Sequence, residues 1–198
     1  MTTRRLAAIL AADVVGYSSM MERDEEGTLR LLKTTQRDLI EPRVREHHGR
    51  IVKTTGDGFL IEFGSPLDAV RCALEVQEAV PADAASGGSE EPLRFRMGIN
   101  LGDIIIEDDG DIYGDGVNVA TRLEQMAVPG KICISGKVFD EVDGKLPAWF
   151  AFTGKQTVKN LSRPVRVYSS RSAPQPKDGT KPLPLPDKPS IAVLPFTN

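Results

Sequence analysis

The sequence predicts an α+β fold built on a split βαβ, ferredoxin-like core, and three observations lead to this prediction. Apolar runs of strand length alternate with amphipathic segments of helix length, in the order strand, helix, strand, strand, helix, strand. The two middle strands flank "GDG", a typical tight-turn sequence. A further helix and further strands follow, so we expect an extra C-terminal helix and strands beside the core.

The first half of the chain supplies a central strand, a long helix and the hairpin. The apolar run over residues 6–15 is typical of a strand buried on both faces. A helix is predicted over about 25–47, kinked at Pro42 and stopped by Gly49. Its apolar stripe consists of Leu29, Leu32, Leu39, Ile40 and Val44. The strands of the "GDG" hairpin follow.

The second half begins with a helix that Ser65 caps and that has Pro66 at its first position. The composition of "PADAASGGSEEP" indicates a surface loop, and "LRFRMGINLGDIIIE" a long strand. The turn-rich "DDGDIYGDG" leads into a helix over about 116–126. After it, "GKICIS" predicts a strand, "GKVFDEV" a short helix, and "WFAFTGKQTV" with "RPVRVYSS" a closing hairpin.

The chain divides into three parts by composition. Residues 1–170 are predicted to form one domain. Residues 171–189 are rich in proline, lysine and aspartate, as expected of a semi-extended linker. Residues 190–198, within "SIAVLPFTN", are apolar again and indicate the first strand of a following domain that is truncated here, or an extra strand of this one.

The composition describes an ordinary soluble globular protein. Among 198 residues 40% are hydrophobic and 27% charged, and the net charge of −3 offers no excess of positive charge for nucleic acid or a membrane surface. Cys72 and Cys133 are predicted to be buried thiols in a reducing compartment. The N-terminal apolar run is signal-like, but it is too short to span a bilayer and Asp13 interrupts it. We therefore expect a cytoplasmic protein.

Two aspartates are candidates for metal binding. Asp13 closes the first strand, where a carboxylate can hold Mg²⁺, although for this residue alone an ordinary aspartate in a strand-to-helix turn is the more common explanation. Asp57 occupies the "GDG" turn, where it is either a turn residue or a second ligand beside Asp13. Two carboxylates that share two divalent ions would suit phosphoryl or nucleotidyl transfer.

The helix in "DGVNVATRLEQMA" has two different faces. At 100° per residue its apolar face consists of Val117, Ala120, Leu123 and Ala127. Asn118 and Arg122 stack on the opposite side, either as a solvated polar face or beneath a ligand or partner subunit. An arginine fork beside an amide is suited to holding a phosphate and a sugar.

Three stretches, "ADVVGYS", "IVKTTGDGFLIEF" and "GDIYGDGVNVATRLE", together resemble the class III nucleotidyl cyclase catalytic domain over about residues 6–169. The resemblance implies two divalent cations, Mg²⁺ or Mn²⁺, on Asp13 and Asp57. It also implies a bacterial enzyme that forms a head-to-tail homodimer. One subunit would supply these aspartates, and the other would supply the residues that contact the base and the ribose and stabilise the transition state.

The same resemblance implies roles for the remaining site residues. Lys53 and Asp111 would read the base, Asn118 would orient the ribose, and Arg122 would stabilise the α-phosphate. Two lysines match more loosely: Lys159 in "TVKNL" would contact the distal phosphates, and Lys131 in "GKICIS" stands where members often carry a basic residue.

A donor and an acceptor on the protein fit adenine, which presents an acceptor at N1 and a donor at N6, whereas guanine reverses both groups. Lys53 and Asp111 provide this pattern, so the sequence predicts an adenylate cyclase that converts ATP to 3′,5′-cyclic AMP and pyrophosphate. No histidine base is expected, because His47 and His48 fall at a helix end and are predicted to face solvent.

Other classes of protein remain as alternatives. A regulatory module could keep this fold and bind nucleotide or dimerise without turnover. An RNA-binding ferredoxin-like domain would need a basic sheet with exposed aromatic residues, and a diguanylate cyclase would carry "GGDEF". The tail "KPSIAVLPFTN" resembles the opening of a TolB-like domain, which implies a regulatory portion C-terminal to the catalytic domain.

Overall fold

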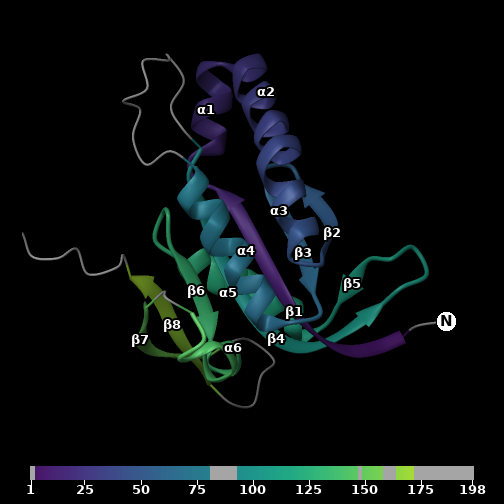
Figure 1. The fold of residues 1–198 in the computed structure, drawn as a ribbon. Coiled ribbons are helices and arrows are strands. Elements are labelled where there is room, and N and C mark those ends of the chain that lie inside the picture. The colour runs from purple at the N-terminus through teal and green to yellow at the C-terminus, as the bar shows by residue number, and fades with distance from the viewer. Residues whose placement is uncertain (1–2, 81–92, 147–148, 158–163, 172–198) are drawn as a thin grey trace, which may run out of the picture.

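The predicted α+β class is confirmed by the structure, a computed structural model that describes residues 3–80, 93–146, 149–157 and 164–171 (Figure 1). Its strands form one sheet in the order β2-β3-β1-β4-β6-β8-β7, and β5 pairs with β4 beyond this path. The pairs β1–β3, β1–β4, β2–β3 and β7–β8 are antiparallel, and β4–β6 is parallel.

The elements in chain order are β1 (Thr3–Val14), α1 (Tyr17–Arg23), α2 (Glu25–Thr35), the π-helical η1 (Gln36–Ile40), α3 (Glu41–Glu46), β2 (Gly49–Thr55), β3 (Gly58–Phe63), α4 (Pro66–Ala79), β4 (Phe95–Ile106), β5 (Ile112–Tyr113), α5 (Asp115–Met126), β6 (Ile132–Ser135), α6 (Gly136–Val142), β7 (Trp149–Gln156) and β8 (Val165–Arg171). The predicted "GDG" hairpin, the helix capped by Ser65 and the closing hairpin are all present.

Strand β1 is buried on both faces, as predicted. Its even-numbered Ala8, Leu10 and Ala12 belong to the core beneath α2, α3, α4 and α6, whereas Ile9 and Ala11 pack on the side covered by α5. Figure 1 shows α4 crossing one face of this central strand. Because alternate residues of a strand point to opposite faces, β1 joins two cores and fixes the layers on either side of it.

The predicted helix over 25–47 is present but is not a regular α-helix. It divides into α2, η1 and α3, and the π-helical turn ends at Ile40, two residues before Pro42. Proline has no N–H and its ring collides with the carbonyl group four residues earlier, so a wider turn in this place relieves the collision. Of the predicted stripe, Leu32, Ile40 and Val44 are buried, whereas Leu29 is exposed.

Gly49 does not stop this helix, contrary to the prediction. His48 takes the left-handed conformation, with φ 56°, and Gly49 already begins β2. A Cβ on Gly49 would collide with the ring of Phe63, so this glycine serves packing of the hairpin. The prediction that both histidines face solvent is confirmed for His48, which is exposed. His47 is mostly buried instead, since its side chain is 12% exposed and its Nε2 lies 3.1 Å from Glu75 Oε1.

Two elements were not predicted: helix α1 and the two-residue strand β5, which lies where the sequence indicated only a turn-rich connection. Cys72 and Cys133 are buried free thiols, as expected, and burial raises the pKa of Cys72 to about 12. The predicted loop at 81–92, the linker at 171–189 beyond its first residue, and the apolar tail lie outside the described residues.

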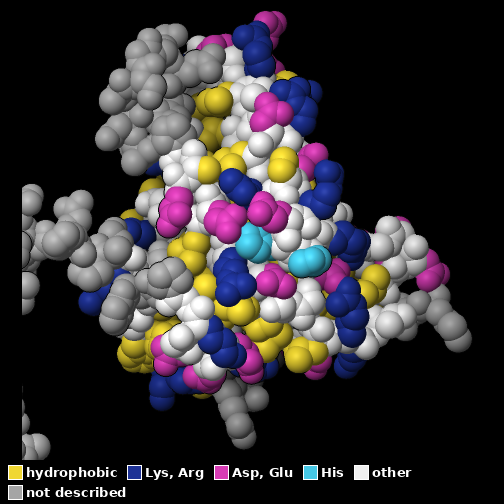
Figure 2. Space-filling view, in the orientation of Figure 1, with side chains coloured by type: hydrophobic (Ala, Val, Ile, Leu, Met, Phe, Trp, Pro, Cys, Tyr) yellow, Lys and Arg dark blue, Asp and Glu magenta, His cyan; other side chains and the backbone are white. Residues whose placement is uncertain are grey.

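On the face shown in Figure 2, basic and acidic side chains alternate around the two histidines. Arg43 pairs with Glu46 and Glu75. Within the part of the chain that the structure describes, no helix is long and apolar enough to cross a membrane.

Helix α5 approaches the sheet closely at one glycine. A methyl group on Gly98 of β4 would collide with the backbone nitrogen of Glu124 and the carbonyl oxygen of Ala120. These are backbone atoms of a helix and cannot rotate away. Gly98 therefore sets the distance between β4 and α5, the helix that carries Asn118 and Arg122.

We predict that Gly98→Ala lowers the free energy of unfolding by at least about 2 kcal/mol, because an added methyl group in a packed interior displaces the backbone around it. Urea unfolding monitored by circular dichroism measures this change. Gly64→Ala is the control, since its Cβ would have no heavy atom within 4 Å. Equal unfolding midpoints for the two variants would contradict the proposed contact.

Candidate active site

The pairing of β1 with β3 brings the two predicted metal-binding aspartates together. Asp13 lies opposite Gly58, the residue that follows Asp57. The turn between β2 and β3 needs the left-handed backbone of Gly56, with φ 70°, which costs little for glycine. The pKa of Asp57 is raised, first by burial and also by the neighbouring carboxyl group of Asp13. The two carboxyl groups therefore share one site.

A third partner of this site is Arg96, which sequence reasoning missed. It stands opposite Asp13 in the β1–β4 register, and its Nη2 lies 2.6 Å from Asp13 Oδ2. The hydrogen bond to Asp13 raises the pKa of Arg96. Only the strand register reveals this partner, because 83 residues separate the two along the chain.

Glu124 on α5 approaches the same group from the other side. It is 6% exposed, and its Oε1 lies 3.3 Å from Arg96 Nε. Burial and the charge of Asp13 raise the pKa of Glu124 to about 7, and Arg96 partly opposes this rise. Sequence reasoning missed this residue too. It falls on the sheet-facing side of the helix, where a single acidic residue among apolar ones indicates a functional or paired carboxylate.

This arrangement fits a divalent cation. Asp13 and Asp57 are adjacent hard oxygen donors, as a divalent cation requires, and the guanidinium of Arg96 pairs with Asp13 and would have to give way to the cation. Among the described residues no group of three or more histidine, cysteine or acidic side chains has metal-binding geometry. Two protein carboxylates with phosphate oxygens as further ligands are the usual pattern for Mg²⁺ bound with a nucleotide.

The predicted base-reading pair is also assembled. Lys53 of β2 donates a 2.7 Å hydrogen bond to Asp111 Oδ2, and the hydroxyl group of Tyr113 donates to the same oxygen at 2.9 Å. The other carboxylate oxygen accepts from the backbone N–H of Ile112. The bond from Lys53 is the main reason that the pKa of Asp111 is lowered. The donor group of Lys53 and the acceptor group of Asp111 thus lie next to each other at the surface.

Helix α5 presents Asn118 and Arg122 outward, as predicted. Both side chains are exposed, and Arg122 Nη1 donates to Gln125 Oε1 at 3.2 Å. The expected buried positions at 120, 123 and 127 are confirmed. Val117 is only half-buried, contrary to the prediction, and Val119 is buried instead, because α5 also packs against residues of β6 and β8.

Of the two loosely matched lysines, one lies apart from the Lys53–Asp111 pair and the other falls outside the described residues. The backbone carbonyl of Lys131 accepts from the N–H of Met97, so this lysine lies near the end of β4 that carries Arg96. Lys159 falls outside the described residues.

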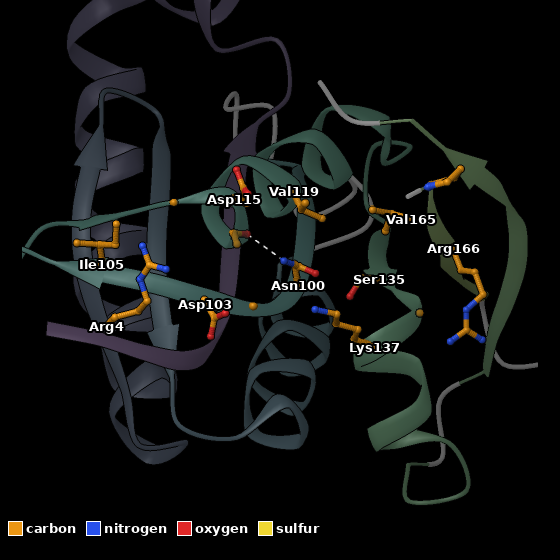
Figure 3. Close-up of a pocket in the computed structure, with 15 residues that line it drawn as sticks. Arg4, Asn100, Asp103, Ile105, Asp115, Val119, Ser135, Lys137, Val165 and Arg166 are labelled. Atoms are coloured by element: carbon orange, nitrogen blue, oxygen red, sulfur yellow. Dashed lines mark hydrogen bonds between the residues drawn. The ribbon is translucent and has the colours of Figure 1, made fainter. Parts of the chain in front are cut away.

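A cavity of about 680 Å³ lies between α5, α6 and β8 (Figure 3). Asp103 and Lys137 line it, and the side-chain nitrogen of Asn100 donates to the carbonyl of Gly116 at 3.0 Å on its wall. None of the predicted site residues that the structure describes lines this cavity. These residues form surface groups instead of one enclosed pocket.

The sequence profile described as "Adenylate and Guanylate cyclase catalytic domain" matches residues 2–163. The chain belongs to this family. A Rhizobium meliloti (strain 1021) protein named "Putative adenylate cyclase 3" is 48% identical to this cyclase domain over 200 residues, which cover 98% of the chain. The alignment spans 34% of that relative, so the chain corresponds to about a third of its length.

Solved cyclase structures share the fold. An adenylate/guanylate cyclase/hydrolase from Silicibacter pomeroyi superimposes with a TM-score of 0.78 and is 46% identical, covering 86% of this chain and 98% of that one. The adenylyl cyclase CyaB from P. aeruginosa gives a TM-score of 0.77 at 25% identity, covering 87% and 96%. The resemblance to class III cyclases is thus confirmed.

We predict a pH dependence of stability from Glu124. Its folded-state pKa of about 7 exceeds its ordinary value of 4.5, so between these values the folded protein binds more protons than the unfolded chain. The contribution of Glu124 to the free energy of unfolding is therefore largest below pH 4.5 and is lost as pH rises through 7. In Glu124→Gln this decrease should disappear.

Denaturant unfolding between pH 4 and 8, with a chelator present, measures the difference between variant and wild type. The difference should increase from pH 4.5 to 7 and then level off. Glu46→Gln is the control, because the Glu46 side chain is 60% exposed. A difference for Glu124→Gln that is constant over the whole range would refute the raised pKa.

Proposed function

We propose that this domain is an adenylate cyclase that converts ATP to 3′,5′-cyclic AMP and pyrophosphate, with each site shared across a head-to-tail homodimer. One observation carries the proposal. Glu124, on the sheet-facing side of α5, contacts the group that contains Asp13, whereas Asn118 and Arg122 project from the opposite side of the same helix. Residues separated in this way within one chain can meet across two chains.

The carboxylate group would hold the cations and the triphosphate. Asp13 and Asp57 would bind two divalent ions, Mg²⁺ or Mn²⁺, which when bound lower the pKa of the ribose 3′-hydroxyl and offset phosphate charge. Arg96 pairs with Asp13 in this structure and would turn towards a phosphate oxygen once another cation neutralises the carboxylate. The protein groups thus prepare a site of balanced charge.

The partner subunit would supply the residues that position the substrate. Its Asn118 side chain would orient the ribose, and its Arg122 guanidinium would donate to the α-phosphate as negative charge develops there. Lys159 would contact the distal phosphates, and Lys131 would be a further basic residue that binds the substrate. The 3′-oxygen forms its bond to the α-phosphorus while the bond to pyrophosphate breaks, so positioning accounts for most of the catalysis.

ATP is the proposed substrate because Lys53 and Asp111 present a donor and an acceptor to the Watson–Crick edge of the base. Adenine complements this pair at N1 and N6, and guanine would place donor against donor and acceptor against acceptor. A mispaired buried polar group is costly, which favours strong discrimination. The name of the relative at 48% identity agrees with this choice.

We also propose how this domain is placed within a longer protein. Residues 1–170 would form the catalytic domain of a longer cytoplasmic protein, with residues 171–189 as a linker to a regulatory domain of the TolB-like kind. The greater length of the Rhizobium meliloti relative supports such an arrangement. Two copies of the domain would form two equivalent sites, so specific activity would rise with protein concentration.

We predict that Asp57→Ala and Arg122→Ala each lower the rate of cyclic AMP formation by at least about 100-fold. Asp57→Ala removes a ligand of the cations that offset the developing negative charge, and Arg122→Ala removes a donor to the α-phosphate. The rate is measured by chromatography of the products formed from ATP with Mn²⁺, and from GTP in parallel. An equimolar mixture of the two variants should recover about one quarter of the wild-type rate, since half of the dimers would hold one intact site of two.

Glu46→Gln, which alters only an exposed ion pair of α3, serves as the control and should retain the wild-type rate. Native mass spectrometry checks that the two variants exchange subunits. A mixture that stays inactive although mixed dimers are present would refute the shared site, and cyclic GMP as the main product would refute the choice of base.

A further inference from the structure

Glu62 is a buried carboxylate on β3 that the proposed reaction does not use. Its side chain is 3% exposed, and it forms ion pairs with Arg5 of β1 and Arg50 of β2. Arg50 stands directly opposite Glu62 in the β2–β3 register and donates to it at 2.7 Å. A buried acid is costly unless it is paired, so this site was built to hold a guanidinium group.

Arg50 uses its second nitrogen for a distant contact. Nη1 donates at 2.9 Å to the carbonyl oxygen of Gly110, a residue 60 positions further along the chain. Gly110 directly precedes Asp111, whose carboxylate Lys53 contacts. Strand β2 therefore holds this turn at two points, the backbone through Arg50 and the acidic side chain through Lys53.

The turn that carries Asp111 is well defined internally but weakly attached to the sheet. Backbone hydrogen bonds join Glu107 to Gly110 and to Asp111, and Gly110 has a φ of 85°. Strand β5 has only two residues, both paired with the end of β4, where the β4–β5 segment projects from the body of the domain (Figure 1). Its distance from β2 depends on contacts outside the sheet.

A bound purine would remove one of these contacts. If a base lies between the groups that read it, Lys53 and Asp111 bond to the base and no longer to each other. The Arg50–Gly110 bond involves a backbone carbonyl and can persist. It would then remain as a direct link from β2 that helps to keep the acceptor at the separation that an adenine edge requires.

We propose that Arg50, oriented by Glu62, is a positioning residue that fixes Asp111 relative to Lys53 and thereby sharpens the selection of adenine. This inference rests on the proposed function, in which Lys53 and Asp111 read the base. Arginine suits the task because its planar fork can donate to a carboxylate and to a carbonyl at once, which a lysine ammonium on a flexible chain does poorly.

The test uses Arg50→Met, which keeps the length of the side chain and removes its donors. We expect the KM for ATP to rise about fivefold while kcat stays within about twofold, because a group that orients bound substrate without touching reacting atoms affects binding most. The ratio of kcat/KM for ATP to that for GTP should fall by a similar factor.

Two variants separate positioning from charge and from general stability. Arg5→Met removes the other partner of Glu62 and should leave the KM and the ATP preference unchanged, since the described contacts of Arg5 do not include the turn. Arg50→Lys should restore only part of the ATP preference. Kinetics are measured at protein concentrations where sedimentation shows dimers, so that altered dimerisation is not mistaken for altered base selection.

Amide hydrogen exchange gives a readout that does not depend on activity. In the nucleotide-free protein, exchange in residues 107–113 should increase in Arg50→Met and not in Arg5→Met. Unchanged exchange there, or increased exchange with unchanged KM and ATP preference, would overturn the positioning role. A wild-type protein that forms no cyclic nucleotide would instead overturn the proposed function, and the exchange result would still decide whether Arg50 holds the turn.

Discussion

The antiparallel pairing of β1 with β3 is the constraint on which the candidate site depends, because it sets the carboxyl groups of Asp13 and Asp57 side by side. Burial is the main reason that the pKa of Asp57 is raised, and repulsion from the neighbouring carboxyl group of Asp13 adds to the rise. The strands tolerate this repulsion because the apolar residues of β1 are buried on both faces and because Arg96 lies against Asp13. A bound cation would relieve the same repulsion, so the fold favours occupation of the site.

Helix α5 separates the two groups of candidate site residues. Its inner face approaches β4 so closely that only glycine fits at position 98, and it places Glu124 against Arg96. Its outer face carries Asn118 and Arg122 into solvent. Since residues that are two positions apart on a helix point about 200° away from each other, Arg122 and Glu124 cannot serve the same pocket of one chain. These opposite directions are the physical basis of the proposed sharing of each site between two chains.

The sequence predicted local features well and pairings across the chain poorly. The "GDG" hairpin, the Ser65 cap and the outward position of Asn118 follow from turn chemistry and helical periodicity, which need only neighbouring residues. The contacts of Arg96 and Arg50 were not predicted, because their partners are set by strand register and by the path of a distant turn. The choice of Val119 over Val117 as a core residue likewise depends on which strands lie beneath the helix. Periodicity finds the buried side of a helix only to within one position when the neighbours are unknown.

In the free chain the charged groups of the candidate site already pair with one another. Arg96 holds Asp13, and Lys53 holds Asp111. Binding of a nucleotide with cations would therefore exchange one set of charge pairs for another, and the net gain in free energy is smaller than the sum of the new contacts. The same exchange improves discrimination: a purine with the wrong pattern of donors and acceptors breaks the Lys53–Asp111 pair and provides nothing in return. Such a site gives up affinity for selectivity, which suits the proposed use of ATP, an abundant nucleotide, to form the signal molecule cyclic AMP.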